Sequence, residues 1–302
     1  MTFFEFLQQF PTEQKVIEYF IKIRYPNGAA CNHCGGLRIS HRSDRPRLFQ
    51  CNDCNDTFSI FTGTIFEKTT TDLRKWMYAI HLFLNGKKGI SGLQLQREIG
   101  VTYKCAWRML KQIRKAMGNK QTQKQFEAII EMDETYVGGK PRKGNKYKDD
   151  DDKDDKNKRG RGSKKTPVVG VLERNGKRVH AKVALPNAEG KKLTGKQLLA
   201  ILNEVCKGDA TIMTDEFKGY NILKRSGFIH LKVDHTKEYA VGDVHSNSIE
   251  SFWAILKRGV YGIYHQVSVK YLQNYVDEFC FRYNNRDVKQ AFDAVLKNAI
   301  IK

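Results

Sequence analysis

The chain has 302 residues, of which 40% are hydrophobic, so it is long enough for one large domain with smaller modules. Its 53 lysines and arginines outnumber the 33 aspartates and glutamates, which gives a formal net charge of +20. Such an excess favours a polyanionic partner, with nucleic acid as the first candidate and a merely soluble basic protein as the alternative. No stretch approaches the roughly 20 apolar residues of a membrane span, so no membrane contact is expected.

The first 125 residues predict a series of small, basic modules. They hold 20 lysines and arginines against 9 aspartates and glutamates, which is more than half of the excess charge. Apolar spacing and turn residues predict short helices within 1–25, followed by a cysteine module at 31–54. A helix is expected at 72–84, beginning at Asp72, and a pair of helices at 91–99 and 102–117 on either side of Gly100. A linker is expected at 118–125.

From residue 126 the pattern changes to strands separated by helices. We expect strands at 128–137, 168–173, 177–185, 210–214 and 228–233, and helices at 193–205, 246–257 and 271–282. Asn175-Gly176 predicts a hairpin turn between the second and third strands. The order is that of a ribonuclease-H-like mixed sheet, so the predicted class is α/β (α+β).

A polar segment at 140–165 separates the first two of these strands. It is crowded with lysine, arginine, glycine and aspartate, which predicts a mobile loop because it offers nothing to pack. Within it, the run Tyr147–Lys153 resembles part of a common epitope tag and is either natural low complexity or an engineered remnant. No chemistry is assigned to its aspartates.

Four of the seven cysteines form the pattern C-x2-C-x16-C-x2-C, at Cys31, Cys34, Cys51 and Cys54. Each pair suits a tight turn that points two thiolates at one ion, and two such turns make a closed tetrahedral Zn²⁺ site that stabilises the fold. Disulfides and iron–sulfur ligation are the weaker alternatives. With no secretory signal at the start, this cysteine usage predicts a reducing, cytoplasmic environment.

The segment 102–117 predicts the second helix of a helix-turn-helix. Its apolar residues recur every three or four positions, and a second, cationic stripe of the same helix holds Lys104, Arg108, Lys111 and Lys115. An ordinary solvated surface helix remains the alternative. Further phosphate contacts are expected between the cysteine pairs, from Arg42, Arg45 and Arg47, with Arg38 beside them.

Acidic residues in the last two-thirds of the chain suggest a metal-dependent phosphoryl-transfer site. Asp133 interrupts an apolar strand, Asp215 ends a short strand, and Glu250 lies on a predicted helix with Lys257 two turns later. Carboxylates at adjacent strand ends, joined by one from a helix, can hold two Mg²⁺ ions. Close competitors for these positions are Glu131, Glu134 and Glu216.

The combination of motifs resembles the DDE transposases of bacterial insertion sequences, in particular the zinc-ribbon group related to the Merlin elements. The resemblance rests on the four cysteines, on Met132-Asp-Glu-Thr-Tyr-Val-Gly-Gly139, Thr214-Asp215, Asn247-Ser-Ile-Glu-Ser-Phe-Trp253, Leu256-Lys-Arg-Gly259 and Phe281-Arg-Tyr-Asn284. It covers nearly the whole chain.

The resemblance implies that Asp133, Asp215 and Glu250 bind the catalytic Mg²⁺ or Mn²⁺, and that Lys257, followed by Arg258, contacts DNA near the reacting phosphate. Asn247 is a rival to Glu250 as a ligand, or else the N-cap of the helix. It also implies a transposase that acts on the terminal inverted repeats of its own element, near the bacterial nucleoid and as a homodimer or larger oligomer. A covalent mechanism through Tyr136 is the disfavoured alternative.

We therefore expect three parts: an N-terminal helix and zinc ribbon at 1–64, a helix-turn-helix region at 65–125, and a ribonuclease-H-like catalytic domain at 126–302. The predicted partner is double-stranded DNA, both terminal repeats and target. Two other functions stay open at this point, a transposase-derived DNA-binding regulator and a ribonuclease-H-like nuclease without mobility.

Overall fold

The computed structural model describes residues 2–118, 125–138, 165–174, 178–188, 193–206, 208, 210–232, 245–286 and 288–300. The chain divides into two compact units, one of residues 1–121 with 285–302 and one of residues 122–284. Within the described ranges, no helix is long and apolar enough to cross a membrane. Residues 140–164 of the loop predicted at 140–165, with the tag-like run, and the Asn175-Gly176 turn lie outside these ranges.

The first unit begins with the two short helices that the sequence predicts, α1 (Phe3–Gln9) and α2 (Glu13–Arg24). The Thr2 hydroxyl accepts a hydrogen bond from the Glu5 amide and the Thr12 hydroxyl accepts one from the Lys15 amide, so each helix has a side-chain cap. Phe20 of α2 packs edge-on against Phe66, which in turn packs edge-on against Trp76. This aromatic column is the core of the unit.

The cysteine module is a small antiparallel sheet in the order β1 (Ile39–His41), β2 (Leu48–Cys51) and β3 (Thr57–Ser59). Phe49 and Phe58 are register partners on β2 and β3, and both side chains are buried. So small a sheet has little apolar area to bury, and it needs a further source of stability such as a bound metal.

Three helices follow, α3 (Leu73–Asn85), α4 (Gly92–Ile99) and α5 (Tyr103–Gly118), close to the predicted bounds. The Asp72 carboxylate caps α3 by accepting from the Arg74 amide at 2.7 Å. Gly100 ends α4 with φ +60°, a left-handed conformation that glycine adopts without strain. Helices α4 and α5 are joined by the tight turn at Gly100 and pack against each other. This is the helix-turn-helix arrangement that the sequence predicts.

The C-terminal segment does not belong to the domain to which the sequence assigned it. Helix α9 (Val288–Ile300) packs against α2, α3 and α5, and the Ile65 amide donates to the Ala299 carbonyl at 3.1 Å. Residues 285–302 therefore complete the first unit, and the expected parts 1–64 and 65–125 share that unit. The amino-acid composition does not change where the chain passes back into the first unit. The sequence therefore gives no sign of it, since the helices that contact the apolar face of α9 are far away in the chain.

The second unit is built on a five-stranded sheet in the order β6-β5-β4-β7-β8. Its strands are β4 (Ile129–Val137), β5 (Thr166–Glu173), β6 (Arg178–Val183), β7 (Thr211–Thr214) and β8 (Ile229–Lys232). The first three pair antiparallel, whereas β7 and β8 run parallel to β4. This is the ribonuclease-H-like mixed sheet that the strand order predicts.

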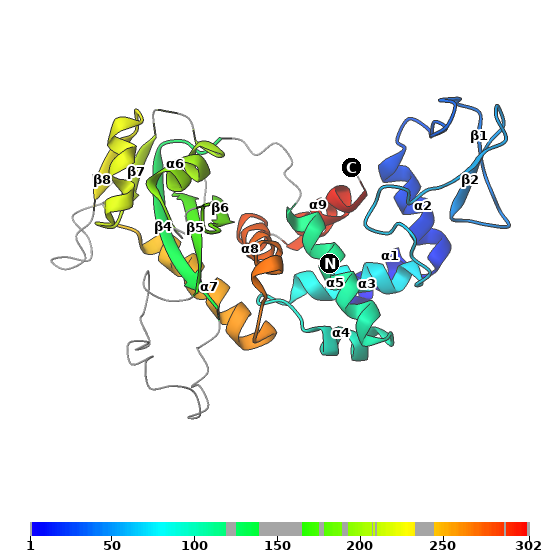
Figure 1. Cartoon of the computed structure of the whole chain (residues 1–302). Coiled ribbons are helices and arrows are strands. Elements are labelled where there is room, and N and C mark those ends of the chain that lie inside the picture. The colour runs from blue at the N-terminus through cyan, green and yellow to red at the C-terminus, as the bar shows by residue number, and fades with distance from the viewer. Residues whose placement is uncertain are drawn as a thin grey trace. The chain divides into compact units, whose positions relative to one another are not determined.

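Helices cover both faces of this sheet (Figure 1). Helix α6 (Gly195–Asn203) and the 3-10 helix η2 (Lys218–Arg225) pack on the face to which Ile130 and Met132 point. Helices α7 (Asn247–Gly259) and α8 (Val269–Asn284) pack on the other face, opposite Val137 and Val168. Because side chains alternate along a strand, Glu131 and Asp133 point toward α7.

Candidate functional site

The ribbon gathers all four predicted cysteines. Their Sγ atoms lie within 4.8 Å of one another, and the Sγ atoms of Cys34 and Cys51 are 3.6 Å apart. This is the arrangement that four thiolates take around one ion. It is the one group of at least three possible metal-binding side chains that meets this distance within the described residues.

Local backbone geometry makes the two halves of this group alike. A residue with positive φ follows the second cysteine of each pair, Gly35 at +74° and Asn55 at +58°. In each half, a backbone amide two residues on donates to the first cysteine, from His33 to Cys31 and from Asp53 to Cys51, both at 3.4 Å. Backbone N–H groups of Cys34 and His33 lower the pKa of Cys31 to about 7, whereas contacts with the other thiols raise the pKa of Cys54.

Asp133 lies in the middle of the central strand, where a glycine on the next strand lets α7 come close. Its register partner is Gly170, and a Cβ at that position would lie 2.6 Å from the Trp253 ring and 2.9 Å from Ile249. The close approach brings the Trp253 indole N–H to Asp133 Oδ2 at 3.0 Å. Gly170 thus allows α7 to reach the carboxylate.

Asp215 reaches the same place from the neighbouring parallel strand. The register pairs Ile129 with Thr211 and Glu131 with Met213, and Asp215 follows the end of β7 two residues after Met213. The Asp215 carboxylate accepts from the Phe217 amide at 3.0 Å, which fixes its side chain just beyond β7. The negative charge of Asp215 raises the pKa of Asp133, so two of the three predicted acids lie near one another.

Burial and the charge of neighbouring acids raise the pKa of Asp133. Burial contributes most, followed by the negative charges of Glu134 and Asp215, and together they raise the pKa of Asp133 to about 7. A carboxylate that is buried beside other acids is destabilised as an anion, and a bound divalent cation would relieve that repulsion. The donor set, made of carboxylate oxygens, suits Mg²⁺ or Mn²⁺.

Glu250 lies in the first turn of α7 and its side chain is exposed. It is one turn before Trp253, so it belongs to the part of α7 that contacts Asp133. Its Oε1 accepts from the Ser246 hydroxyl at 3.1 Å, and it does not form a tight group with the two aspartates within the described residues. Ser246, and not Asn247, is the N-cap residue of α7.

Glu131, which the sequence analysis considered as an alternative metal-binding acid, lies in a buried ion-pair network. Its side chain is fully buried, forms an ion pair with Arg174 at 2.6 Å, and accepts from the Ile249 amide at 2.9 Å. Arg174 also donates to the carbonyl oxygen and to Nδ1 of His245, at 2.6 and 2.8 Å. This network connects the start of α7 to the centre of the sheet. In the sequence, its only indication was an acidic residue within an apolar strand.

Glu134 points to the opposite face of the sheet from Asp133. Tyr220, which is fully buried in the core under α6, donates its hydroxyl to Glu134 at 2.8 Å. Burial raises the pKa of Tyr220 well above its usual range, so the hydroxyl keeps its proton and remains a donor. Of the two neighbouring acids, Asp133 is the one that faces α7.

The predicted cationic stripe on α5 is partly solvent-facing and partly engaged. Lys104 and Lys115 are exposed, and Lys111 lies over the Trp107 ring at 5.3 Å. Arg108 donates to the Glu67 carbonyl at 3.1 Å. The sequence prediction missed Trp107, which is 38% exposed on this helix. Its position outside the row of buried apolar residues could have indicated that it faces solvent.

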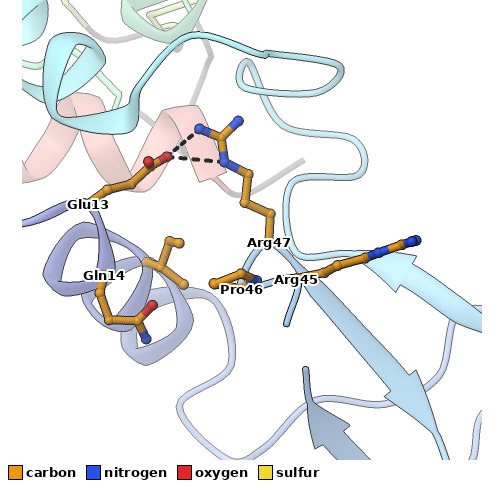
Figure 2. Close-up of a pocket in the computed structure, with 6 residues that line it drawn as sticks. Glu13, Gln14, Arg45, Pro46 and Arg47 are labelled. Atoms are coloured by element: carbon orange, nitrogen blue, oxygen red, sulfur yellow. Dashed lines mark hydrogen bonds and ion pairs between the residues drawn. The ribbon is translucent and has the colours of Figure 1, made fainter. Parts of the chain in front are cut away.

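The ribbon arginines differ from one another. Arg47 is committed to the fold: it pairs with Glu13 of α2 (Figure 2), and it donates to the Thr69 carbonyl at 2.8 Å. Arg42 forms a two-bond pair with Asp44, at 3.0 and 2.6 Å. Arg45 extends away from Glu13 in Figure 2 and its side chain is 67% exposed. Of the three, Arg45 is the most available to a phosphate.

On α7, Lys257 and Arg258 are both exposed. Lys257 follows Glu250 by seven residues and so shares its helix face. The Arg258 guanidinium donates back to the Ala254 carbonyl at 3.1 Å. The exposed face of α7 therefore carries a cation two turns beyond the acid.

Comparison with known families assigns both parts of the chain. A model described as the ISXO2-like transposase domain matches residues 125–284, which is just over half of the chain. The chain belongs to this transposase family. A second model, the transposase zinc-ribbon domain, matches residues 11–57. The family domain ends where the second unit ends, at Asn284, which agrees with the transfer of α9 to the first unit.

Individual relatives agree with this assignment. A protein in transposable element ISH50 of Halobacterium salinarum is 29% identical over 97% of this chain and 99% of its own length. A transposase-like protein of Haemophilus influenzae is 28% identical over 39% of this chain and 90% of its own.

Solved structures show a slighter likeness. The Mos1 strand transfer complex matches with a TM-score of 0.30 and 13% identity, over 74% of this chain and 78% of that one. A simian T-cell lymphotropic virus intasome matches with a TM-score of 0.32 and 14% identity, over 63% of each chain.

Proposed function

We propose that this chain binds the terminal inverted repeats of an insertion sequence and catalyses metal-dependent cleavage and transfer of the DNA strand. The observation that carries the proposal is the meeting of three elements at Asp133. Asp215 directly follows β7, the strand that pairs parallel with β4, and the Trp253 indole of α7 donates to Asp133 at 3.0 Å. Glu250 lies one turn before that indole.

Asp133, Asp215 and Glu250 would hold the metal ions. A pair of divalent ions, when bound, activates the attacking oxygen and stabilises the leaving oxygen at phosphorus. The chain's own contribution is to keep these carboxylates in place. Trp253 orients Asp133, the Phe217 amide orients Asp215, and the Glu131–Arg174 pair fixes the start of the helix that carries Glu250.

The first unit would recognise the element ends. The exposed lysines of α5, Lys104 and Lys115, suit phosphates on either side of a groove, and Arg45 of the ribbon adds a further cation. Lys257 would hold the DNA backbone beside the acids. Since each element has two ends and each end needs a catalytic site, we propose that a homodimer or larger oligomer assembles on DNA.

The test uses a duplex that ends in the terminal repeat flanking the gene, with Mg²⁺ and a target plasmid. Asp133→Asn should abolish both cleavage and joining while binding of the end survives, because the lost carboxylate is needed for chemistry and not for recognition. Joining of a pre-cut 3′ end to the plasmid separates a transposase from a simple nuclease. Normal joining by Asp133→Asn would overturn the assignment.

Glu134→Gln is the matched control. It neutralises the neighbouring acid, which points to the other face of the sheet toward Tyr220, and it should keep both cleavage and joining. If both substitutions abolish the reaction equally, the assignment of Asp133 by its orientation toward α7 is wrong.

A further inference from the structure

The second unit contains a cavity of about 240 Å³ at the end of β4, beyond the acidic site. Val137, the last residue of β4, and Gly138 after it line the cavity together with Tyr261, His265, Gln266 and Ser268. These residues surround the cavity with aromatic rings and hydrogen-bonding groups. Its lining residues, all of them described, include no lysine or arginine, so it is not built for a phosphate.

The backbone around the cavity has two uncommon features. Residues Val260–Tyr264 form a π-helical turn, η3, directly after α7. His265 then takes φ +57° and ψ −53°, and the Gln266 amide donates to the Tyr264 carbonyl at 2.6 Å, which is the rare γ-turn of positive φ. A non-glycine residue keeps this strained conformation only where its surroundings impose it, and such positions cluster at ligand sites.

Buried contacts hold this turn firmly. The Tyr264 hydroxyl donates to Glu278 of α8 at 2.8 Å, and Glu278, which is fully buried, pairs with Arg282 at 3.0 Å. On the other side, the Tyr261 hydroxyl lies 3.3 Å from the Gly138 carbonyl. The cavity wall is therefore fixed before any ligand arrives, which lowers the entropic cost of binding.

A DNA strand that followed α7 from the acidic site would reach this cavity. Glu250, Ala254 and Lys257 are four and three residues apart, so they share one face of α7, and Tyr261 follows in η3; all four are exposed. Helix α7 runs alongside β4 in the same direction, because Trp253 bonds Asp133 and Tyr261 bonds Gly138. The cavity is ~16 Å from Glu250 along the helix.

We propose that this cavity, which we call the Tyr261 cavity, receives one unpaired nucleobase of the bound DNA strand. The inference rests on the proposed function and adds a subsite to it. Lys257 would hold the backbone, and the base would stack on the exposed rings of Tyr261 and His265 with its polar edge toward Gln266 and Ser268. At ~3.4 Å for a stacked nucleotide and more for an extended one, the base lies about two to five nucleotides from the reacting phosphate.

The experiment places the fluorescent base 2-aminopurine at each of the six positions next to the cleavage site in the terminal-repeat duplex. With the Asp133→Asn chain, which binds without cutting, fluorescence should rise severalfold at one position because the base leaves the stack. Tyr261→Ala should abolish that rise, whereas Tyr261→Phe should keep it, since Phe retains the ring and loses only the bond to Gly138. Tyr271→Ala removes a tyrosine of α8 outside the cavity and serves as the matched control.

A second measurement separates a base site from a structural role of Tyr261. In the otherwise unchanged chain, Tyr261→Ala should slow joining about tenfold, the effect of one lost stacking ring. An abasic nucleotide at the bright position should remove most of that difference, because there is no base left to accommodate. A defect that is equal on abasic and normal DNA would overturn the proposal.

The two proposals fail in different ways. Uniformly low 2-aminopurine fluorescence in a complex whose unsubstituted chain still joins DNA overturns the Tyr261 cavity as a base site and leaves the proposed function intact. An unsubstituted chain that neither binds the end nor joins it overturns both.

Discussion

The ribbon and the acidic site are both suited to metal ions, but they are assembled in opposite ways. The four cysteines form two short local turns, and each turn carries its own positive-φ residue and its own amide-to-sulfur bond. The acids come from the middle of β4, the end of β7 and the start of α7, which are far apart in the chain. A site made of local turns can be predicted from the spacing of its residues. A site made from three elements depends on how those elements pack.

The largest effect should come from the ribbon, because binding of structural zinc is worth about 10–16 kcal/mol in small zinc modules. Cys51→Ser removes a buried ligand and should reduce bound zinc to well below one equivalent, with loss of end binding. Native mass spectrometry and a binding assay measure both. Cys105→Ser, outside the cluster, is the matched control, and a full equivalent of zinc in Cys51→Ser would contradict the proposed site.

At the acidic site, the buried pair of Glu131 and Arg174 should matter next. Glu131→Gln leaves the Arg174 guanidinium without its charged partner, and breaking a buried pair in this way costs about 3–5 kcal/mol. The start of α7 should loosen, so joining activity should fall while end binding by the first unit is kept. Chemical unfolding and a joining assay check the two parts. Unchanged stability would show that the network does not anchor α7.

A smaller effect is expected from Gly170→Ala, which tests whether the close approach of α7 builds the site. The added methyl would lie 2.6 Å from Trp253, and overpacking of this kind costs roughly 1–3 kcal/mol. Displacement of α7 should also reduce joining activity more than stability alone explains. Gly208→Ala, where a Cβ meets nothing within 4 Å, is the control and should be silent in thermal unfolding and in joining.

The smallest effect, counted per pH unit, concerns the pH dependence of stability. Because the pKa of Asp133 is raised to about 7 and is about 3.9 in an unfolded chain, the folded state binds the proton more tightly. Its contribution to stability is present below about pH 4 and is lost as pH rises to about 7, by at most about 1.4 kcal/mol per pH unit. Without added Mg²⁺, Asp133→Asn should remove that slope from denaturant midpoints. Identical slopes in both chains would contradict the shift.

Patterns in the sequence predicted most of the elements and failed where long-range packing decided. The helix pair around Gly100 and the capped start of α3 at Asp72 depend on neighbouring residues, so they were predicted correctly. Helix α9 was assigned to the wrong unit because its partners, α2, α3 and α5, lie more than 150 residues away. Among the arginines between the cysteine pairs, spacing could not distinguish Arg47, bound to Glu13, from the exposed Arg45.

The sequence by itself determined the cysteine cluster, the order of strands and the identity of the candidate acids, since these follow from spacing, alternation and residue type. Packing of the second unit decided which surface each acid faces. Side-chain alternation and the close approach of α7 at Gly170 turn Asp133 toward Trp253, bury Glu131 against Arg174, and send Glu134 to Tyr220 on the other face. Neighbouring carboxylates cannot be distinguished chemically in the sequence. They differ only in the residues that each one contacts in the folded chain.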